Sequence, residues 1–83
     1  MLVQVRLFAM YREIVGVGQL SWTLRSGATV GQLVEAVLAR YPRLSGHEDS
    51  MLLAVNHEVV RPDLVLRDGD EVALLPPVSG GDK

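Results

Sequence analysis

The end of this chain combines small side chains with two prolines. Pro76-Pro77-Val78-Ser79-Gly80-Gly81 follows the last hydrophobic run, and Asp82 and Lys83 come after it. A segment with no large side chain beyond Val78 cannot pack into a core, so we expect it to be threaded into another molecule. Paired glycines also occur in ordinary disordered ends. The preceding residues 66–75 predict a turn and a strand, which would aim the segment outward.

The chain offers no catalytic constellation of its own. It has no cysteine, so any sulfur chemistry must use sulfur brought from outside. His47 and His57 have no second ligand pair at metal spacing, and we expect both to be solvated surface residues and no metal to be bound. The acidic residues between 68 and 71 lack the rest of a calcium loop and are expected to form a turn.

Composition indicates one small domain with an aliphatic core. Hydrophobic residues make up 48% of the 83 residues and aromatic residues only 5%. Ten acidic against eight basic residues give a net charge of -2 without a basic block, so a nucleic-acid partner is not expected. No apolar run approaches the roughly 18 residues that span a bilayer, and no signal-peptide pattern is present, so we expect a cytoplasmic protein without membrane contact.

The first part of the chain predicts two strands around a short helix. Alternating apolar residues predict strands over residues 2–8 and 20–24, paired antiparallel. Residues 9–15 fit one or two helical turns, and Gly16 stands where helices commonly end in a left-handed conformation.

The strongest predicted helix begins after Thr29. Thr29 and Gln32 have the spacing of a capping box, and Pro42 ends the helix. Its apolar positions recur with helical period: Val30, Leu33, Val34, Val37 and Leu38.

The remaining predicted elements are a strand over residues 51–55, a turn at 56–58, a short edge strand at 59–60 broken by Pro62, a tight turn at 68–70 and a last strand over 72–75. The first and last of these strands are nearly continuous apolar runs, so we expect both near the sheet centre and covered on more than one side.

The element order predicts an α+β, ubiquitin-like β-grasp domain over residues 1–76, with a mixed four- to five-stranded sheet packed on one main helix. Residues 77–83 would form a flexible tail.

Three groups of residues carry a resemblance to a known family. They are Leu7-Phe8-Ala9 with Arg12-Glu13 and Gly16, then Val55-Asn56, and then Asp68-Gly69-Asp70-Glu71-Val72-Ala73 followed by the segment from Pro76 to Gly81. On these residues the sequence resembles the small, sulfur-carrying subunit of molybdopterin synthase, in the MoaD/ThiS family of β-grasp proteins. The Pro-Pro-Val-Ser-Gly-Gly ending favours the molybdopterin branch, whereas a bare Gly-Gly suits any ubiquitin-like carrier.

The resemblance implies a sulfur carrier for molybdenum cofactor biosynthesis that is not catalytic alone. In such proteins an E1-like enzyme uses ATP to adenylate the terminal glycine, here Gly81, and a persulfide protein supplies sulfur for a thiocarboxylate. The large synthase subunit takes up the thiocarboxylate, which gives its sulfur to a cyclic pterin precursor. No permanently bound cofactor is implied. The residues expected to enter the partner's channel are Gly80, Ser79, Val78, Pro77 and Pro76, and those expected at the partner interface are Phe8, Arg12, Val59 and Leu75.

Some of these assignments have alternatives in the sequence itself. Arg12 also fits a solvated helix face, and Phe8, Val59 and Leu75 also fit an ordinary core. A carboxylate locked in the Gly81–Asp82 peptide bond cannot be adenylated, so a protease is expected to remove Asp82 and Lys83. The rival functions are a protein modifier joined to lysines, a sulfur carrier for thiamine or tRNA thiolation, and an interaction module that is never activated.

Overall fold

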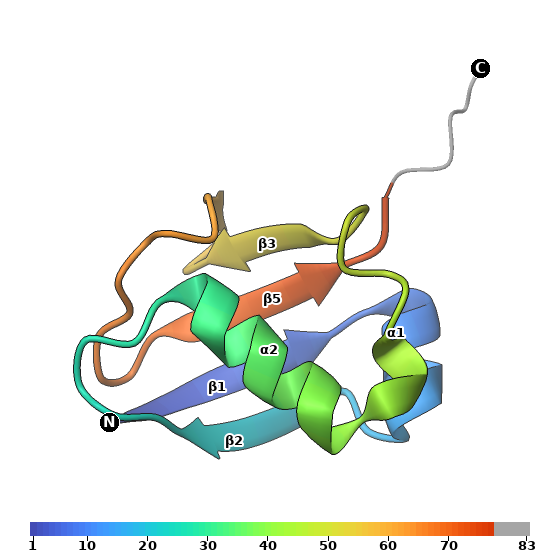
Figure 1. The fold of residues 1–83 in the computed structure, drawn as a ribbon, viewed down its shortest axis with the longest axis horizontal. Helices are drawn as coiled ribbons and strands as arrows, with labels where there is room; N and C mark the ends of the chain where they lie inside the picture. The colour runs from blue at the N-terminus through green and yellow to red at the C-terminus, as the bar shows by residue number, and fades with distance from the viewer. Residues whose placement is uncertain (78–83) are drawn as a thin grey trace.

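The computed structural model describes residues 1–77, in which a helix crosses one face of a five-stranded sheet (Figure 1). The elements in chain order are β1 (Leu2–Leu7), α1 (Ala9–Val15), β2 (Gln19–Thr23), α2 (Val30–Arg40), the 3₁₀ turn η1 (Pro42–Leu44), β3 (Leu52–Val55), β4 (Glu58–Val59) and β5 (Glu71–Leu75). The expected α+β architecture with one main helix is confirmed.

The sheet is mixed, with the order β2-β1-β5-β3-β4. Strand β1 pairs antiparallel with β2 and parallel with β5, and β5 pairs antiparallel with β3. Because β1 and β5 run in the same direction, β1 leads into α1 and β5 leads into Pro76 at one end of the sheet (Figure 1). We call this end the α1 end.

Helix α2 begins as its sequence predicts. The Thr29 hydroxyl accepts a hydrogen bond from the Gln32 amide, and the Gln32 side chain accepts one from the Thr29 amide, which completes the capping box. The next two amides, of Val30 and Gly31, donate to carbonyls of the segment between β4 and β5. This contact fixes the long connection against the start of the helix.

The core lies between α2 and the sheet. Alternate residues of β1 and β5 point into it, and the fully buried side chains are Tyr11, Leu33, Leu44, Leu74, Val3, Val5, Val30, Val37 and Val72. Gly16 ends α1 with a φ of 97°, in the left-handed region, as its position predicted.

Two expectations need correction. Phe8 does not extend the first strand, because β1 ends at Leu7 and Phe8 is the N-cap of α1. The strands β3 and β5 are not fully covered on both faces: burial alternates along β5, and Leu52 in β3 is 39% exposed. The apolar run in β3 therefore supplies one side of the core and one side of a surface.

No helix within residues 1–77 has the length and apolar character needed to cross a membrane.

Candidate functional site

The face of the sheet away from α2 carries the candidate site, and we call it the open face. Paired residues share a face, so strand register shows which side chains line it. One row across the open face holds Arg6, Ala73, Ala54 and Val59, and the next row toward the α1 end holds Leu75 and Leu52. Phe8 continues this second row because it is extended and follows Leu7, which pairs with Leu74.

These two rows form an apolar patch at the α1 end. The patch consists of Phe8, Leu52, Ala54, Val59, Ala73 and Leu75. Val59 is 73% exposed and Phe8 is 37% exposed, while Leu75 is half-buried. Solvated apolar side chains that adjoin one another mark contact surfaces more often than isolated ones do.

Charged side chains border the patch. Arg6 donates to the Glu71 carboxylate at 3.0 Å, and its guanidinium lies 5.7 Å from the centre of the Phe8 ring. His57 approaches the other oxygen of Glu71 at 3.5 Å. An apolar centre with a charged rim is the usual composition of a protein interface.

Three of the four expected interface residues, Phe8, Val59 and Leu75, lie on this one face, whereas Arg12 does not. Arg12 is exposed on α1, and its side chain lies against Gly18. The distance is short: a Cβ atom added to Gly18 would lie 3.4 Å from Nε of Arg12. It shares the α1 end of the sheet with the patch, but not the open face.

Leu52 belongs to the patch and was missed from the sequence. It pairs with Leu75, so the two side chains are neighbours on the open face. The signal was strand alternation: with Leu53 and Val55 turned to the core, Leu52 must point the other way. The unbroken apolar run hid this alternation.

The opposite end of the sheet is held together by Asn56. Its amide nitrogen donates to the Asp70 carboxylate at 3.0 Å, and its amide oxygen accepts from the backbone of Glu71 at 3.1 Å. Asp70 also accepts from the Arg67 amide at 2.8 Å. Within the expected turn at residues 68–70, the Asp70 side chain thus joins the turn to the β3–β4 connection.

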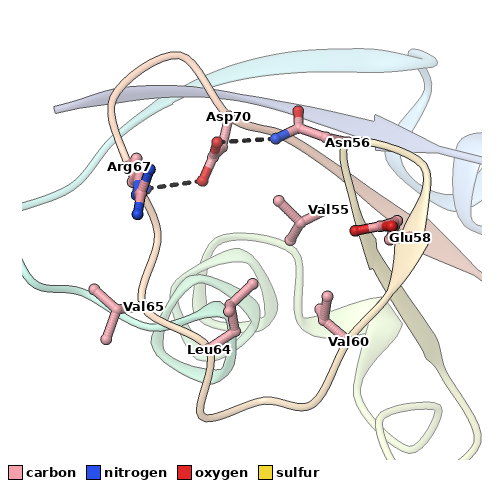
Figure 2. Close-up of a pocket in the computed structure, with 8 residues that line it drawn as sticks. All are labelled: Val55, Asn56, Glu58, Val60, Leu64, Val65, Arg67 and Asp70. Carbon is pink, nitrogen blue, oxygen red and sulfur yellow. Dashed lines mark hydrogen bonds between the residues drawn. The ribbon is translucent and has the colours of Figure 1, made fainter.

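A pocket of about 310 Å³ opens beside this contact, between the β3–β4 turn and the segment that leads to β5 (Figure 2). Its lining consists of Val55, Asn56, Glu58, Val60, Leu64, Val65, Arg67 and Asp70. Figure 2 shows Asp70 turned toward Asn56 and Arg67, so its carboxylate is engaged within the fold. The pocket lies away from the α1 end, and we do not assign the candidate site to it.

The histidines differ from each other. His57 is exposed, as expected, but His47 is half-buried, and its ring meets Tyr11 edge-on with the ring centres 5.7 Å apart. The expectation of a solvated His47 was therefore wrong, because α1 packs against the loop after η1. Within residues 1–77 there is no group of three histidine, aspartate or glutamate side chains that could hold a metal.

The expected channel residues fall mostly outside the described part of the chain. Pro76 and Pro77 follow β5 directly. Val78, Ser79, Gly80 and Gly81, together with Asp82 and Lys83, lie outside it.

Comparison with protein families gives a match to the ThiS family over residues 5–81. The chain belongs to this family. The matched range includes β2 to β5 and the second half of β1 and runs through Gly81, and the resemblance drawn from the sequence is thereby confirmed.

Curated relatives match over nearly the whole chain. The molybdopterin synthase sulfur carrier subunit of Chlamydomonas reinhardtii is 40% identical over 98% of this chain and all of its own length. Small archaeal modifier protein 3 of Haloferax volcanii is 37% identical over 94% of this chain and 97% of its own length. Two differently named kinds of protein therefore resemble this chain to a similar degree.

Solved structures share the fold. SAMP1 from Haloferax volcanii matches with a TM-score of 0.88 and 29% identity over 98% of this chain and all of its own. A second match is a chain from the protein-protein complex of subunits 1 and 2 of the molybdopterin-converting factor from Helicobacter pylori. Its TM-score is 0.70 and its identity 27%, over 98% of the present chain and the whole of the matched chain.

Proposed function

We propose that this protein is the sulfur carrier subunit of a molybdopterin synthase. The observation that carries the proposal is the 40% identity, over nearly the entire chain, to a protein of that name. The place of the apolar patch supports it, because the patch adjoins the end of β5 from which residues 76–81 continue.

The reactive group in this proposal is the carboxylate of Gly81. A carboxylate is a poor electrophile, so an adenylating enzyme first converts it to an acyl-adenylate with ATP. The outer sulfur of a persulfide protein then attacks the acyl carbon, AMP leaves, and an acyl disulfide joins the two proteins. A thiol from outside this chain reduces the S–S bond, is itself oxidised to a disulfide, and releases the thiocarboxylate. The glycines leave the reacting carbon accessible, while Pro76 and Pro77 limit the entropy lost when the segment enters a partner.

The large synthase subunit is the proposed partner of the apolar patch. A carrier that docks through Phe8, Val59 and Leu75 would place the start of its terminal segment at the contact. The related Helicobacter pylori chain was solved in a complex of subunits 1 and 2, which supports a partner of this kind. The sulfur chemistry would then take place in the partner, so the carrier alone would not be an enzyme, and its need for ATP fits the cytoplasm.

Processing is part of the proposal, because Asp82 and Lys83 block the Gly81 carboxylate. A protease would remove them and leave the net charge at -2, with nine acidic and seven basic residues instead of ten and eight. The described elements all lie before residue 78, so removal would leave them intact.

The test compares the chain ending at Gly81 with the chain ending at Lys83. Each is incubated with an adenylating enzyme, ATP and a persulfide donor, and the intact mass is measured. The shorter chain should gain about 16 Da, the difference between sulfur and oxygen, and the longer chain should not change. Equal activation of both chains would contradict the processing step, and activation of neither would contradict the carrier function.

A protein modifier is the second candidate, favoured by the 37% identity to small archaeal modifier protein 3. The activated Gly81 would then be joined to a lysine of a target protein. The two functions share activation and differ in the acceptor. Gel shifts of cellular proteins that carry the chain would favour the modifier, and thiocarboxylate consumed with a pterin precursor would favour the sulfur carrier.

A further inference from the structure

The basic residues of this chain are distributed unusually between arginine and lysine. Seven of the eight are arginines, at positions 6, 12, 25, 40, 43, 61 and 67. The only lysine is Lys83, two residues after Gly81. The cleavage that would expose the Gly81 carboxylate would therefore also remove the one ε-amine of the sequence.

This distribution matters because an activated acyl group reacts with amines and thiols. The amine nitrogen attacks the Gly81 carbonyl carbon, a C–N bond forms, and the bond from that carbon to the leaving group breaks. The leaving group departs with the electron pair, and the nitrogen loses a proton to solvent. A cysteine thiolate would attack in the same way, but the sequence contains no cysteine.

Arginine does not replace lysine in this reaction. At pH 8.5 about 1% of an ordinary lysine is the free amine, whereas roughly one guanidinium in 10⁴ or fewer is deprotonated. The arginines of the sequence thus keep the positive charges needed for contacts, such as the pair of Arg6 with Glu71, without offering a nucleophile.

We propose that the side chains of the chain ending at Gly81 are inert toward its own activated form. They accept no acyl group from a second copy, which leaves Met1 as the one amine of the sequence that could react. If the chain is a protein modifier, it forms no isopeptide-linked chains. The inference rests on the proposed activation and processing at Gly81.

The remaining amine is the amino group of Met1, which donates a hydrogen bond to Leu24 O at 2.6 Å. It lies at the start of β1, at the end of the sheet opposite the α1 end (Figure 1). An acetylated nitrogen can still donate this bond. Acetylation therefore allows the side chains to be tested alone without removing the contact.

The test uses a chain ending at Gly81 that carries a chemically installed C-terminal thioester, so no activating enzyme is needed. The N-acetylated chain is incubated at pH 8.5, and covalent dimer is measured by intact mass. Arg43→Lys and Arg61→Lys are the matched variants, because both arginines are exposed and lie outside the patch. We expect dimer from the variants to exceed that from the unsubstituted chain by at least about tenfold, given the difference in free base.

A second acceptor sharpens the test. When the thioester chain is mixed with the full chain ending at Lys83, an adduct should form on Lys83, located by peptide mass spectrometry. Free N-acetyl-lysine methyl ester confirms in parallel that the thioester is reactive.

Two results would overturn the inference. One is dimer from the unsubstituted chain at the rate of the lysine variants. The other is absence of dimer from every chain, variants included, while the free lysine derivative reacts, because the surface and not its composition would then prevent acylation. Neither result depends on adenylation of Gly81 by the activating enzyme. Failure of the proposed function would instead be seen in the intact-mass assay with adenylating enzyme, ATP and persulfide donor.

Discussion

The amide nitrogen of Asn56 donates to the carboxylate of Asp70 at 3.0 Å and thereby joins the β3–β4 turn to the start of β5. Asn56 has a φ of 51°, in the left-handed region, where asparagine is tolerated better than most residues. One side chain thus serves both the local turn and a contact between segments fourteen residues apart.

We predict that this contact contributes to stability. Asn56→Ala should lower the free energy of unfolding by about 2 kcal/mol, from lost hydrogen bonds and a left-handed conformation that alanine disfavours. Asn56→Gly removes the same side chain but tolerates the backbone conformation, and should lower it by about 1 kcal/mol. Urea denaturation measures both. A glycine variant as stable as the original chain would show that the amide contributes nothing.

The apolar patch predicts a separation of binding from folding. Val59 is 73% exposed, so Val59→Glu should change the free energy of unfolding by less than about 0.5 kcal/mol. In an interface the same carboxylate would lose its water without a partner, and affinity for the large synthase subunit should fall roughly 30-fold or more.

The matched control is Val65→Glu, because Val65 is 55% exposed and lies outside the patch. Calorimetric titration with the large subunit compares the two variants. Equal affinity of the Val59 variant and the original chain would remove the patch from the proposed interface.

The terminal glycine predicts a steric requirement in the partner. In the chain ending at Gly81, Gly81→Val should abolish sulfur transfer, since a β-branched side chain would collide with a narrow channel, and Gly81→Ala should reduce it less. Thermal unfolding should be the same for all three chains. Single-turnover sulfur transfer measures the effect, and full activity of the valine variant would mean that the channel is wide.

Replacing Tyr11 with phenylalanine is expected to preserve or raise the stability of the domain. Its side chain is fully buried, and its hydroxyl has no hydrogen-bond partner among residues 1–77. Since a buried hydroxyl without a partner is unfavourable, Tyr11→Phe should raise the free energy of unfolding by about 1 kcal/mol or leave it unchanged. A loss above about 1 kcal/mol would reveal a bound partner such as a buried water.

The same residue predicts a pH effect. Burial raises the pKa of the Tyr11 phenol, so the folded state binds the proton more tightly than the unfolded state. Ionisation of the phenol therefore leaves the free energy of unfolding unchanged below the unfolded pKa of about 10 and lowers it as the pH rises above that value. Above pH 10 the original chain should therefore lose stability faster than Tyr11→Phe, and parallel denaturation curves would contradict this.

Local signals in the sequence predicted the helices well. The capping box of Thr29 and Gln32 and the left-handed Gly16 act within a few residues, so their geometry follows from spacing alone. The family resemblance, in turn, rested on motifs at both ends of the chain, and the matched range of residues 5–81 confirms it.

Contacts between distant segments were harder to predict. The pairing of Leu52 with Leu75 depends on the order of the strands, which hydrophobic period does not encode. The bond from Asn56 to Asp70 likewise joins two turns that only the folded chain brings together. Arg12 was expected at the partner interface on the family resemblance, and the sequence alone does not show that α1 places it off the open face.

The central place of β5 has a mechanical consequence. Four residues of β5 pair with β1 on one side, and four pair with β3 on the other. A force that draws residues 76–81 into a partner would act along β5 and load both ladders in shear, so that many hydrogen bonds would resist it together instead of opening one at a time. The strand that leads to the terminal segment is thus anchored on both sides against tension, and a partner could pull on it without unravelling the domain.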